Sequence, residues 1–217
     1  DKILTRLHEI ATDKGFSPSS LTNYIRNPLQ FYMQRILRIN EADEVEENIA
    51  VNTLGTIIHN ALEELYTPYL NQFLALHHIE AMETKIDEVI LKHFKEIYKE
   101  GEITKGKNLL AFEVAKRNVY NFLQLEKKDI EEGHAIKVVL LEASLFCEIE
   151  VKSLPFPIKI AGKVDRIEER NGAIRIIDYK TGKVLGNSLK INDFTDLTSD
   201  IKNEKIIQLL CYALMFE

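Results

Sequence analysis

The stretch GKVDRIEERNGAIRIIDYKTG (residues 162–182) decides the fold of this chain. Two apolar runs flank an Asn-Gly pair at 171–172, and Asn-Gly supplies the positive φ angles of a tight type I′ turn, so the stretch predicts a β-hairpin. The first run carries Asp165; the second carries Asp178, with Lys180 two positions later. Side chains two apart in a strand share a face, so Asp178 and Lys180 are expected side by side, with Asp165 on the partner strand.

This arrangement of charges predicts a metal site. Two converging, partly buried carboxylates repel each other unless a proton or a cation lies between them, and carboxylate oxygens suit a hard cation such as Mg²⁺ or Mn²⁺. A lysine there can orient or deprotonate a water or stabilise an oxyanion, as phosphodiester hydrolysis requires. The alternative is a set of exposed charges on a sheet. Gly162, the apolar run before Asp178 and the Thr-Gly pair after Lys180 count against it.

Composition indicates an ordinary globular protein. Hydrophobic residues make up 45% and charged residues 29% of the 217, and no apolar run approaches the roughly 18 residues of a membrane span. The formal net charge of −6 argues weakly against nucleic-acid binding, but residues 158–190 hold eight Lys or Arg against four Asp or Glu. Cys147 and Cys211 have no partner at metal-ligand spacing, so we expect free thiols, and their reduced state favours the cytoplasm.

The pattern along the chain predicts an α+β (α/β) fold. Amphipathic segments predict a helical part over about 1–133, and runs rich in Val, Ile and Leu predict a sheet and catalytic core over about 136–217. We expect one domain over 1–217, with a mixed central sheet. The chain begins without Met and ends within a helical pattern, so a fragment of a longer protein is expected. Helices are predicted over residues 1–15, 72–100, 107–132 and 203–216. Three more are predicted from their ends: one is capped by Ser17 or Ser19, one is opened by Pro28, and one is capped by Asn52 or Thr53 and ended by Pro68. An acidic loop is predicted at 41–48.

Four ordered blocks resemble the PD-(D/E)xK nuclease superfamily, specifically its RecB-like branch. The hairpin motifs GKVDRI and IIDYKTG are one block, and SPSSLTNYIRNPLQFYMQRILRI (17–39) resembles the branch's N-terminal helical signature. GTIIHNALEELY (55–66) resembles its Gly-x-x-x-His helix, and QLLCY (208–212) matches its Gln-x-x-x-Tyr motif. A single Asp-x-Lys is common, whereas four blocks in family order are specific. The resemblance implies a restriction-endonuclease-like core.

The resemblance also implies roles for individual residues. His59, Asp165 and Asp178 match metal ligands, with the backbone carbonyl of Tyr179 as a further ligand, and Lys180 matches the catalytic lysine. Gln208 and Tyr212, one helical turn apart, match a motif that contacts the DNA strand and braces the lysine. Gly55, on the His59 face of its helix, is expected to allow close approach to the sheet.

Some residues keep open alternatives. Glu142 is a metal contact or a structural partner of a basic residue. Lys163 and Arg166 hold a phosphate backbone or form an exposed face. The other histidines are expected at the surface; they are His8, His77, His78, His93 and His134.

The implied activity is a Mg²⁺- or Mn²⁺-dependent deoxyribonuclease. The expected substrate is single-stranded DNA at an end, in recombination or double-strand-break repair, as the nuclease domain of a larger helicase–nuclease with a helicase domain or subunit as partner. Alternatives are a stand-alone phage- or CRISPR-associated exonuclease, and a catalytically silent DNA-binding or scaffold module. Many relatives hold an iron–sulfur cluster whose first cysteine precedes the proline; Asn27 stands there, so no cluster is expected.

Overall fold

A computed structural model describes residues 2–39, 50–98, 105–182, 184, 186–191, 193–198 and 201–217. The chain divides into two compact units, each described by itself. Unit 1 comprises residues 1–43, 143–164 and 183–217, and unit 2 comprises residues 44–142 and 165–182. The predicted acidic loop at 41–48 lies outside the described residues. No helix in the described ranges has the length and apolarity needed to cross a membrane.

The described residues of unit 2 form the helices α4 (Val51–Tyr66), α5 (Leu76–Glu83), α6 (Ile86–Ile97) and α7 (Gly106–Glu131), and a 3-10 turn at Thr67–Tyr69. Two predictions about them are wrong. Helix α4 begins after Ala50 without a side-chain cap, so Asn52 and Thr53 lie inside its first turn. The single helix predicted over 72–100 is two helices, because the chain breaks at Thr84, whose hydroxyl donates to the Ala81 carbonyl (2.8 Å) and competes with the helical backbone bonds.

In the described part of the chain the strands are β1 (Ile136–Ile149), β2 (Ile158–Arg170) and β3 (Ala173–Ile177), in the spatial order β1-β2-β3. Strands β2 and β3 pair antiparallel, from Arg166 opposite Ile177 to Arg170 opposite Ala173. Positive φ angles at Asn171 (52°) and Gly172 (83°) close the turn, which confirms the predicted hairpin. The α+β class is confirmed. Among the described residues, parallel pairing occurs at an isolated β-bridge between Phe16 and Ile160.

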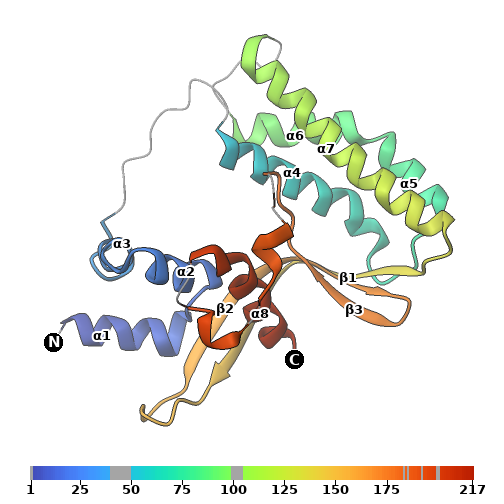
Figure 1. Ribbon diagram of the computed structural model, residues 1–217. Helices are drawn as coiled ribbons and strands as arrows, with labels where there is room; N and C mark the ends of the chain where they lie inside the picture. The colour runs from blue at the N-terminus through green and yellow to red at the C-terminus, as the bar shows by residue number, and fades with distance from the viewer. Residues whose placement is uncertain are drawn as a thin grey trace. The chain divides into compact units, whose positions relative to one another are not determined.

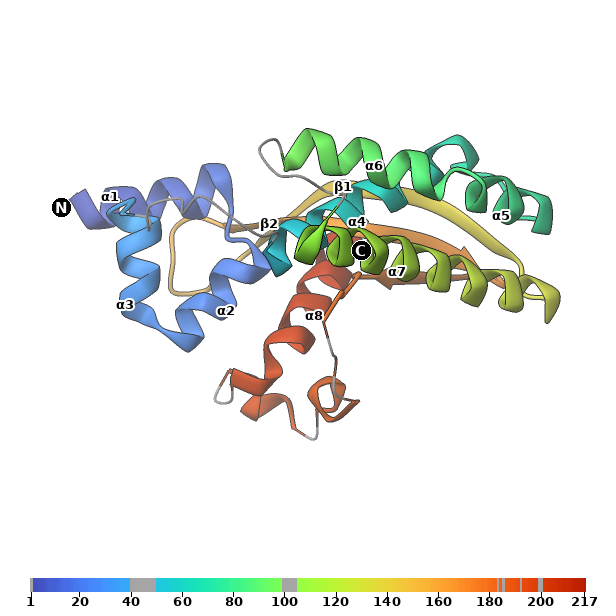
Figure 2. The same ribbon diagram turned by 90° about the horizontal axis from the view of Figure 1, so that it is seen from above.

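The core of unit 2 lies between its helices and the sheet strands that belong to it. Figures 1 and 2 show α4 alongside α6 and α7, with part of β1 and β3 against one side of this helical layer. Fully buried members of this core include Ile57, Ala61, Ile90, Val119, Leu123 and Val138. Burial of these side chains contributes on the order of 1.5–3 kcal/mol for each large one and fixes α4 against β1. The rotation of α4 about its axis is thereby set.

Unit 1 contains α1 (Lys2–Glu9), α2 (Pro18–Arg26), α3 (Pro28–Phe31) and α8 (Glu204–Phe216). Helix α1 continues as a π-helical turn (Ile10–Lys14) and α3 as another (Tyr32–Ile36); 3-10 turns cover Gly186–Leu189, Phe194–Asp196 and Ile201–Asn203.

The predicted start of α2 is confirmed. The Ser17 hydroxyl accepts from the Ser20 N–H (3.1 Å), with Pro18 in the first turn. Gly162 on β2 is needed for close packing, because a Cβ there would lie 3.0 Å from Cδ of Pro18 and 3.1 Å from Cε of Met215.

Candidate metal centre

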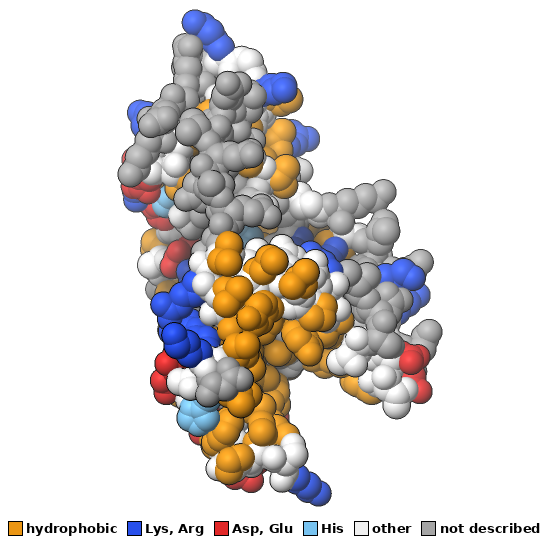
Figure 3. Space-filling view, turned by 90° about the vertical axis from the view of Figure 1, so that its left-hand side faces the viewer, with side chains coloured by type: hydrophobic (Ala, Val, Ile, Leu, Met, Phe, Trp, Pro, Cys, Tyr) orange, Lys and Arg blue, Asp and Glu red, His pale blue; other side chains and the backbone are white. Residues whose placement is uncertain are grey.

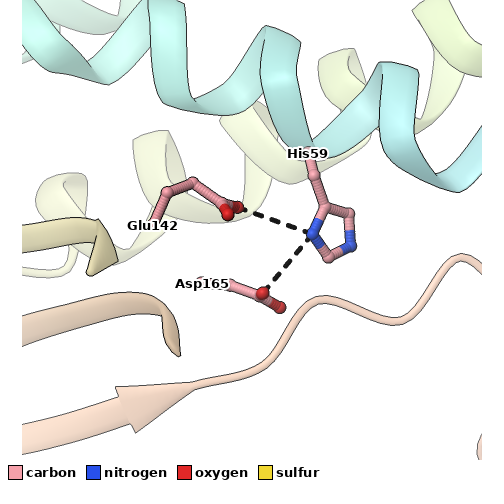
Figure 4. Close-up of side chains that lie close together, drawn as sticks. All are labelled: His59, Glu142 and Asp165. Carbon is pink, nitrogen blue, oxygen red and sulfur yellow. Dashed lines mark ion pairs between the residues drawn. The ribbon is translucent and has the colours of Figure 1, made fainter. Parts of the chain in front are cut away.

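Three side chains of unit 2 converge from three elements (Figure 4). His59 comes from α4, Glu142 from β1 and Asp165 from β2. Nδ1 of His59 lies 3.4 Å from Oδ1 of Asp165 and 3.6 Å from Oε1 of Glu142. One ligand atom from each residue lies within 4.8 Å of the other two, which is a spacing that suits one metal ion.

Local backbone structure explains how each group reaches this point. Residues 164–168 of β2 are all buried, so Asp165 is held inside the unit rather than on a surface. Glu142 has a φ of 46°, in the left-handed backbone region that residues other than glycine rarely adopt. Such strain costs on the order of 1–2 kcal/mol and is concentrated at functional sites.

Tyr179 fixes both Asp165 and His59. Its backbone N–H donates to Oδ2 of Asp165 (2.6 Å), which leaves Oδ1 directed at His59. Its ring meets the imidazole edge-on at 5.5 Å and the ring of Phe122 at 5.2 Å. Burial raises the pKa of the Tyr179 phenol, so the ring stays neutral. The chain therefore orients two of the three donors before any ion binds.

The two carboxylates dominate the electrostatics of His59. Hydrogen bonding to Asp165, and then to Glu142, raises the pKa of His59 from 6.5 to about 10. The imidazolium thus supplies the positive charge that two nearby carboxylates require. A divalent cation coordinated by Nδ1 and two carboxylate oxygens would meet the same requirement. The donor chemistry therefore fits a divalent metal ion.

Asp178 and Lys180 lie outside this group of three. Strand β3 ends at Ile177, so the prediction that Asp178 and Lys180 share a strand face is wrong in its geometry. Their side chains nevertheless form an ion pair beyond the strand end, with the Asp178 carboxylate nearly buried. Burial raises the pKa of Asp178, and Lys180 partly offsets that effect. The sequence prediction grouped Asp178 with His59 and Asp165, and the group with ligand spacing in the structure consists of His59, Glu142 and Asp165.

Gln208 and Tyr212 lie one turn apart on α8 of unit 1, as their spacing predicts. Nε2 of Gln208 donates to the Tyr212 hydroxyl over 2.7 Å. This bond orients the two side chains relative to each other.

Arg166 has neither of the two roles predicted for it. Its side chain is fully buried and contacts the carboxylates of Glu126 and Glu168, each at 2.5 Å. The guanidinium also lies over the Tyr66 ring, 4.7 Å from its centroid. Burial opposes the charge, but the Glu126 carboxylate outweighs it and holds the pKa of Arg166 well above its usual range. Arg166 is therefore inaccessible to a phosphate backbone.

Two smaller predictions also change. His93, predicted at the surface, is buried, with Nε2 2.7 Å from Glu64. A Cβ at Gly55 would make an ordinary 3.6 Å contact with Thr181, so space does not require glycine there.

A second group, Asp129, Glu132 and His134, also has ligand spacing. Its members already make structural contacts: Arg170 pairs with Asp129 (2.8 Å), and Nδ1 of His134 lies 2.9 Å from the Asn171 amide. These contacts account for the cluster without an ion.

Comparison with known proteins identifies the family. The sequence matches the profile of the PD-(D/E)XK nuclease superfamily over residues 15–217, and the chain belongs to this superfamily. Its α+β architecture is consistent with the restriction-endonuclease-like fold.

Similar curated proteins come from Rickettsia. An uncharacterized protein of Rickettsia conorii is 23% identical over 187 residues, which cover 82% of this chain and 20% of the relative. One of Rickettsia felis is 25% identical over 186 residues with the same coverage. The chain thus spans about a fifth of the length of these relatives.

Proposed function

We propose that this chain is a metal-dependent deoxyribonuclease that hydrolyses DNA phosphodiester bonds. The observation that carries the proposal is the position of the His59 Nδ1 within 3.4 and 3.6 Å of two carboxylates, with the Asp178–Lys180 pair following in the same hairpin. PD-(D/E)XK proteins are typically metal-dependent nucleases, and this donor set has the chemistry such an enzyme requires.

His59, Glu142 and Asp165 hold the ion, and Asp178 and the Tyr179 carbonyl are further candidate ligands. When bound, a divalent cation supplies Lewis-acid stabilisation of the charge that develops on the scissile phosphate. One imidazole nitrogen beside carboxylate oxygens favours Mn²⁺ over Mg²⁺, since Mg²⁺ strongly prefers oxygen ligands.

Lys180 orients the attacking water and stabilises negative charge on the phosphate oxygens. Its Nζ is held by Asp178, so the ammonium is positioned before substrate arrives. Tyr179 keeps Asp165 and His59 in place through its backbone and its ring. Gln208 and Tyr212 contact the DNA strand through their linked amide and hydroxyl.

The finer assignment is an exonuclease of the RecB-like branch that acts on single-stranded DNA ends in recombination or double-strand-break repair. The ordered blocks from residue 17 to residue 212 support this branch. Relatives about five times the length of the matched segment are consistent with a nuclease domain joined to a helicase.

The test is cleavage of end-labelled single-stranded and duplex DNA with Mg²⁺, Mn²⁺ or EDTA. We expect cleavage to depend on the metal. Lys180→Ala should lower the cleavage rate by at least about a hundredfold, because removing one positioned group that stabilises transition-state charge usually costs that much in rate. Lys95→Ala, at an exposed position of α6, is the matched control and should cleave normally. Cleavage that persists in EDTA, or equal loss in both variants, would refute the proposal, and the product ladder reports polarity.

A further inference from the structure

Unit 1 contains a cavity of about 400 Å³ at the junction of α1, α2 and α3 with strand β2. Four cationic side chains line it, and two aromatic rings contribute to its wall; the residues are Arg6, Lys14, Arg35, Arg38, Phe16 and Phe31. We call it the basic cavity. None of its lining residues belongs to the metal group.

The charge of the basic cavity is strongly one-sided. Among the residues that the structure describes, no Asp or Glu lines this cavity. Arg6 pairs with Glu9 (2.8 Å), which lies outside the lining, while across the described ranges Lys14, Arg35 and Arg38 form no ion pair with a carboxylate. Like charges gathered around a concave surface repel one another and produce a focused positive potential. Such an arrangement in a chain of net charge −6 points to an anionic ligand.

The wall of the basic cavity is apolar and fixed in position. Phe16 and Phe31 stack with centroids 6.5 Å apart and an interplanar angle of 27°. Hydrogen bonds from the Phe16 N–H to the Lys159 carbonyl (2.8 Å) and from the Ala161 N–H to the Phe16 carbonyl (3.0 Å) tie this residue to β2. Backbone anchoring on both sides presents the Phe16 ring without an ordering cost on binding.

The surroundings of the cavity show the same combination of side chains. The face seen in Figure 3 bears hydrophobic side chains beside Lys and Arg side chains. Exposed apolar residues of α1, α3 and the π-helical turn after α3 include Leu4, Leu29 and Met33, and Leu37 directly after that turn is also exposed. Cations that track a backbone, together with aromatic rings that accept bases, are the usual composition of a site for single-stranded nucleic acid.

We propose that the basic cavity binds a nucleotide of single-stranded DNA, with phosphates on Lys14, Arg35 and Arg38 and a base against Phe16. This inference rests on the proposed function and adds a second contact region for the strand, away from the bond being cleaved. The volume of the cavity lies in the range of sites for small organic ligands and exceeds what one phosphate fills. An aromatic wall would be of no use to a bare phosphate, which has no apolar face.

The test measures binding of a fluorescein-labelled oligo-dT by anisotropy in EDTA, so that no cleavage occurs. Lys14→Glu/Arg35→Glu reverses two exposed cations of the cavity, and Lys95→Glu/Arg117→Glu makes the same charge change on α6 and α7. Each lost phosphate contact on single-stranded DNA lowers the slope of log affinity against log salt concentration by about 0.7. At 0.1 M salt this corresponds to binding that is about fivefold weaker. We expect the cavity variant to bind about 25-fold more weakly, and the control variant less than twofold.

A second arm separates a nucleotide from a bare phosphate. Phe16→Leu should weaken binding of oligo-dT about fivefold and leave an abasic oligomer of equal length unaffected. Inorganic phosphate at matched ionic strength should compete poorly. Equal weakening of both double variants, or full competition by inorganic phosphate, would overturn the proposal.

The outcomes also separate this inference from the nuclease proposal. Metal-dependent cleavage together with wild-type affinity in the cavity variant would refute the cavity alone. Specific weakening of binding without any cleavage by the unmodified chain would refute the nuclease activity alone.

Discussion

The backbone N–H of Tyr179 donates a 2.6 Å hydrogen bond to Oδ2 of Asp165, across the two arms of one hairpin. The bond joins the residue after Asp178 to the carboxylate that faces His59. The ring of the same tyrosine contacts the imidazole of His59 edge-on. Tyr179, between Asp178 and Lys180, thus aligns a carboxylate from a strand with an imidazole from a helix, which explains how the hairpin and α4 contribute to one candidate site.

Glu142→Gln tests whether the Glu142 carboxylate is a metal ligand. The amide keeps the shape of the side chain but loses its charge, so we expect Mn²⁺ affinity to fall at least about tenfold in a calorimetric titration. Glu63→Gln, one turn from His59 on α4 and outside the group of three, is the control and should bind Mn²⁺ normally. An unchanged affinity in Glu142→Gln would leave Glu142 as a structural partner of His59.

Sequence patterns proposed His59 and Asp165 as metal ligands, and the structure brings their side chains together, but the patterns left Glu142 undecided. A strand pattern predicts alternating faces, and it gives no sign of the left-handed φ at Glu142. The pattern also extended the last strand through Lys180, although the ladder between β2 and β3 stops at the pair Arg166–Ile177.

Arg166 shows a different limit of sequence reasoning. A charged residue in a strand is usually exposed, and the countercharge that permits its burial comes partly from Glu126 on α7. The distance between these residues in the sequence hides their contact. By contrast, the hairpin turn and the helix start at Ser17 depend on neighbouring residues, and both were predictable.

Arg166→Met should destabilise the chain strongly. The substitution leaves the carboxylates of Glu126 and Glu168 in the interior without their shared cation, which typically costs about 3–5 kcal/mol. Urea denaturation measures this loss as a lower midpoint.

Arg175→Met is the matched control for that measurement. Arg175 contacts the buried Glu168 carboxylate at 3.3 Å from a half-exposed position, and an ion pair whose cation stays solvated contributes about 1 kcal/mol or less. Comparable losses in Arg166→Met and Arg175→Met would show that the buried ion pairs are not what stabilises this part of unit 2.

Gly172→Ala should destabilise the hairpin that carries Asp165. Gly172 has a φ of 83°, which alanine adopts only under strain, so we expect a loss of about 1 kcal/mol or more in the free energy of unfolding. Asn171, the other central residue of the turn, accepts a hydrogen bond from the Ala135 N–H (2.8 Å). A distorted turn should therefore also loosen the start of β1.

Gly182→Ala provides the comparison, because a Cβ at Gly182 meets no atom within 4 Å among the described residues and its φ lies outside the left-handed region. Removing glycine there reduces the entropy of the unfolded chain, so a neutral or slightly stabilising effect is expected. The measurement compares the urea unfolding midpoints of the two alanine variants, and the midpoint of Gly172→Ala should be the lower. If Gly172→Ala were as stable as Gly182→Ala, the turn at 171–172 would not be what holds the two arms of the hairpin, and with them Asp165 and Tyr179, in register.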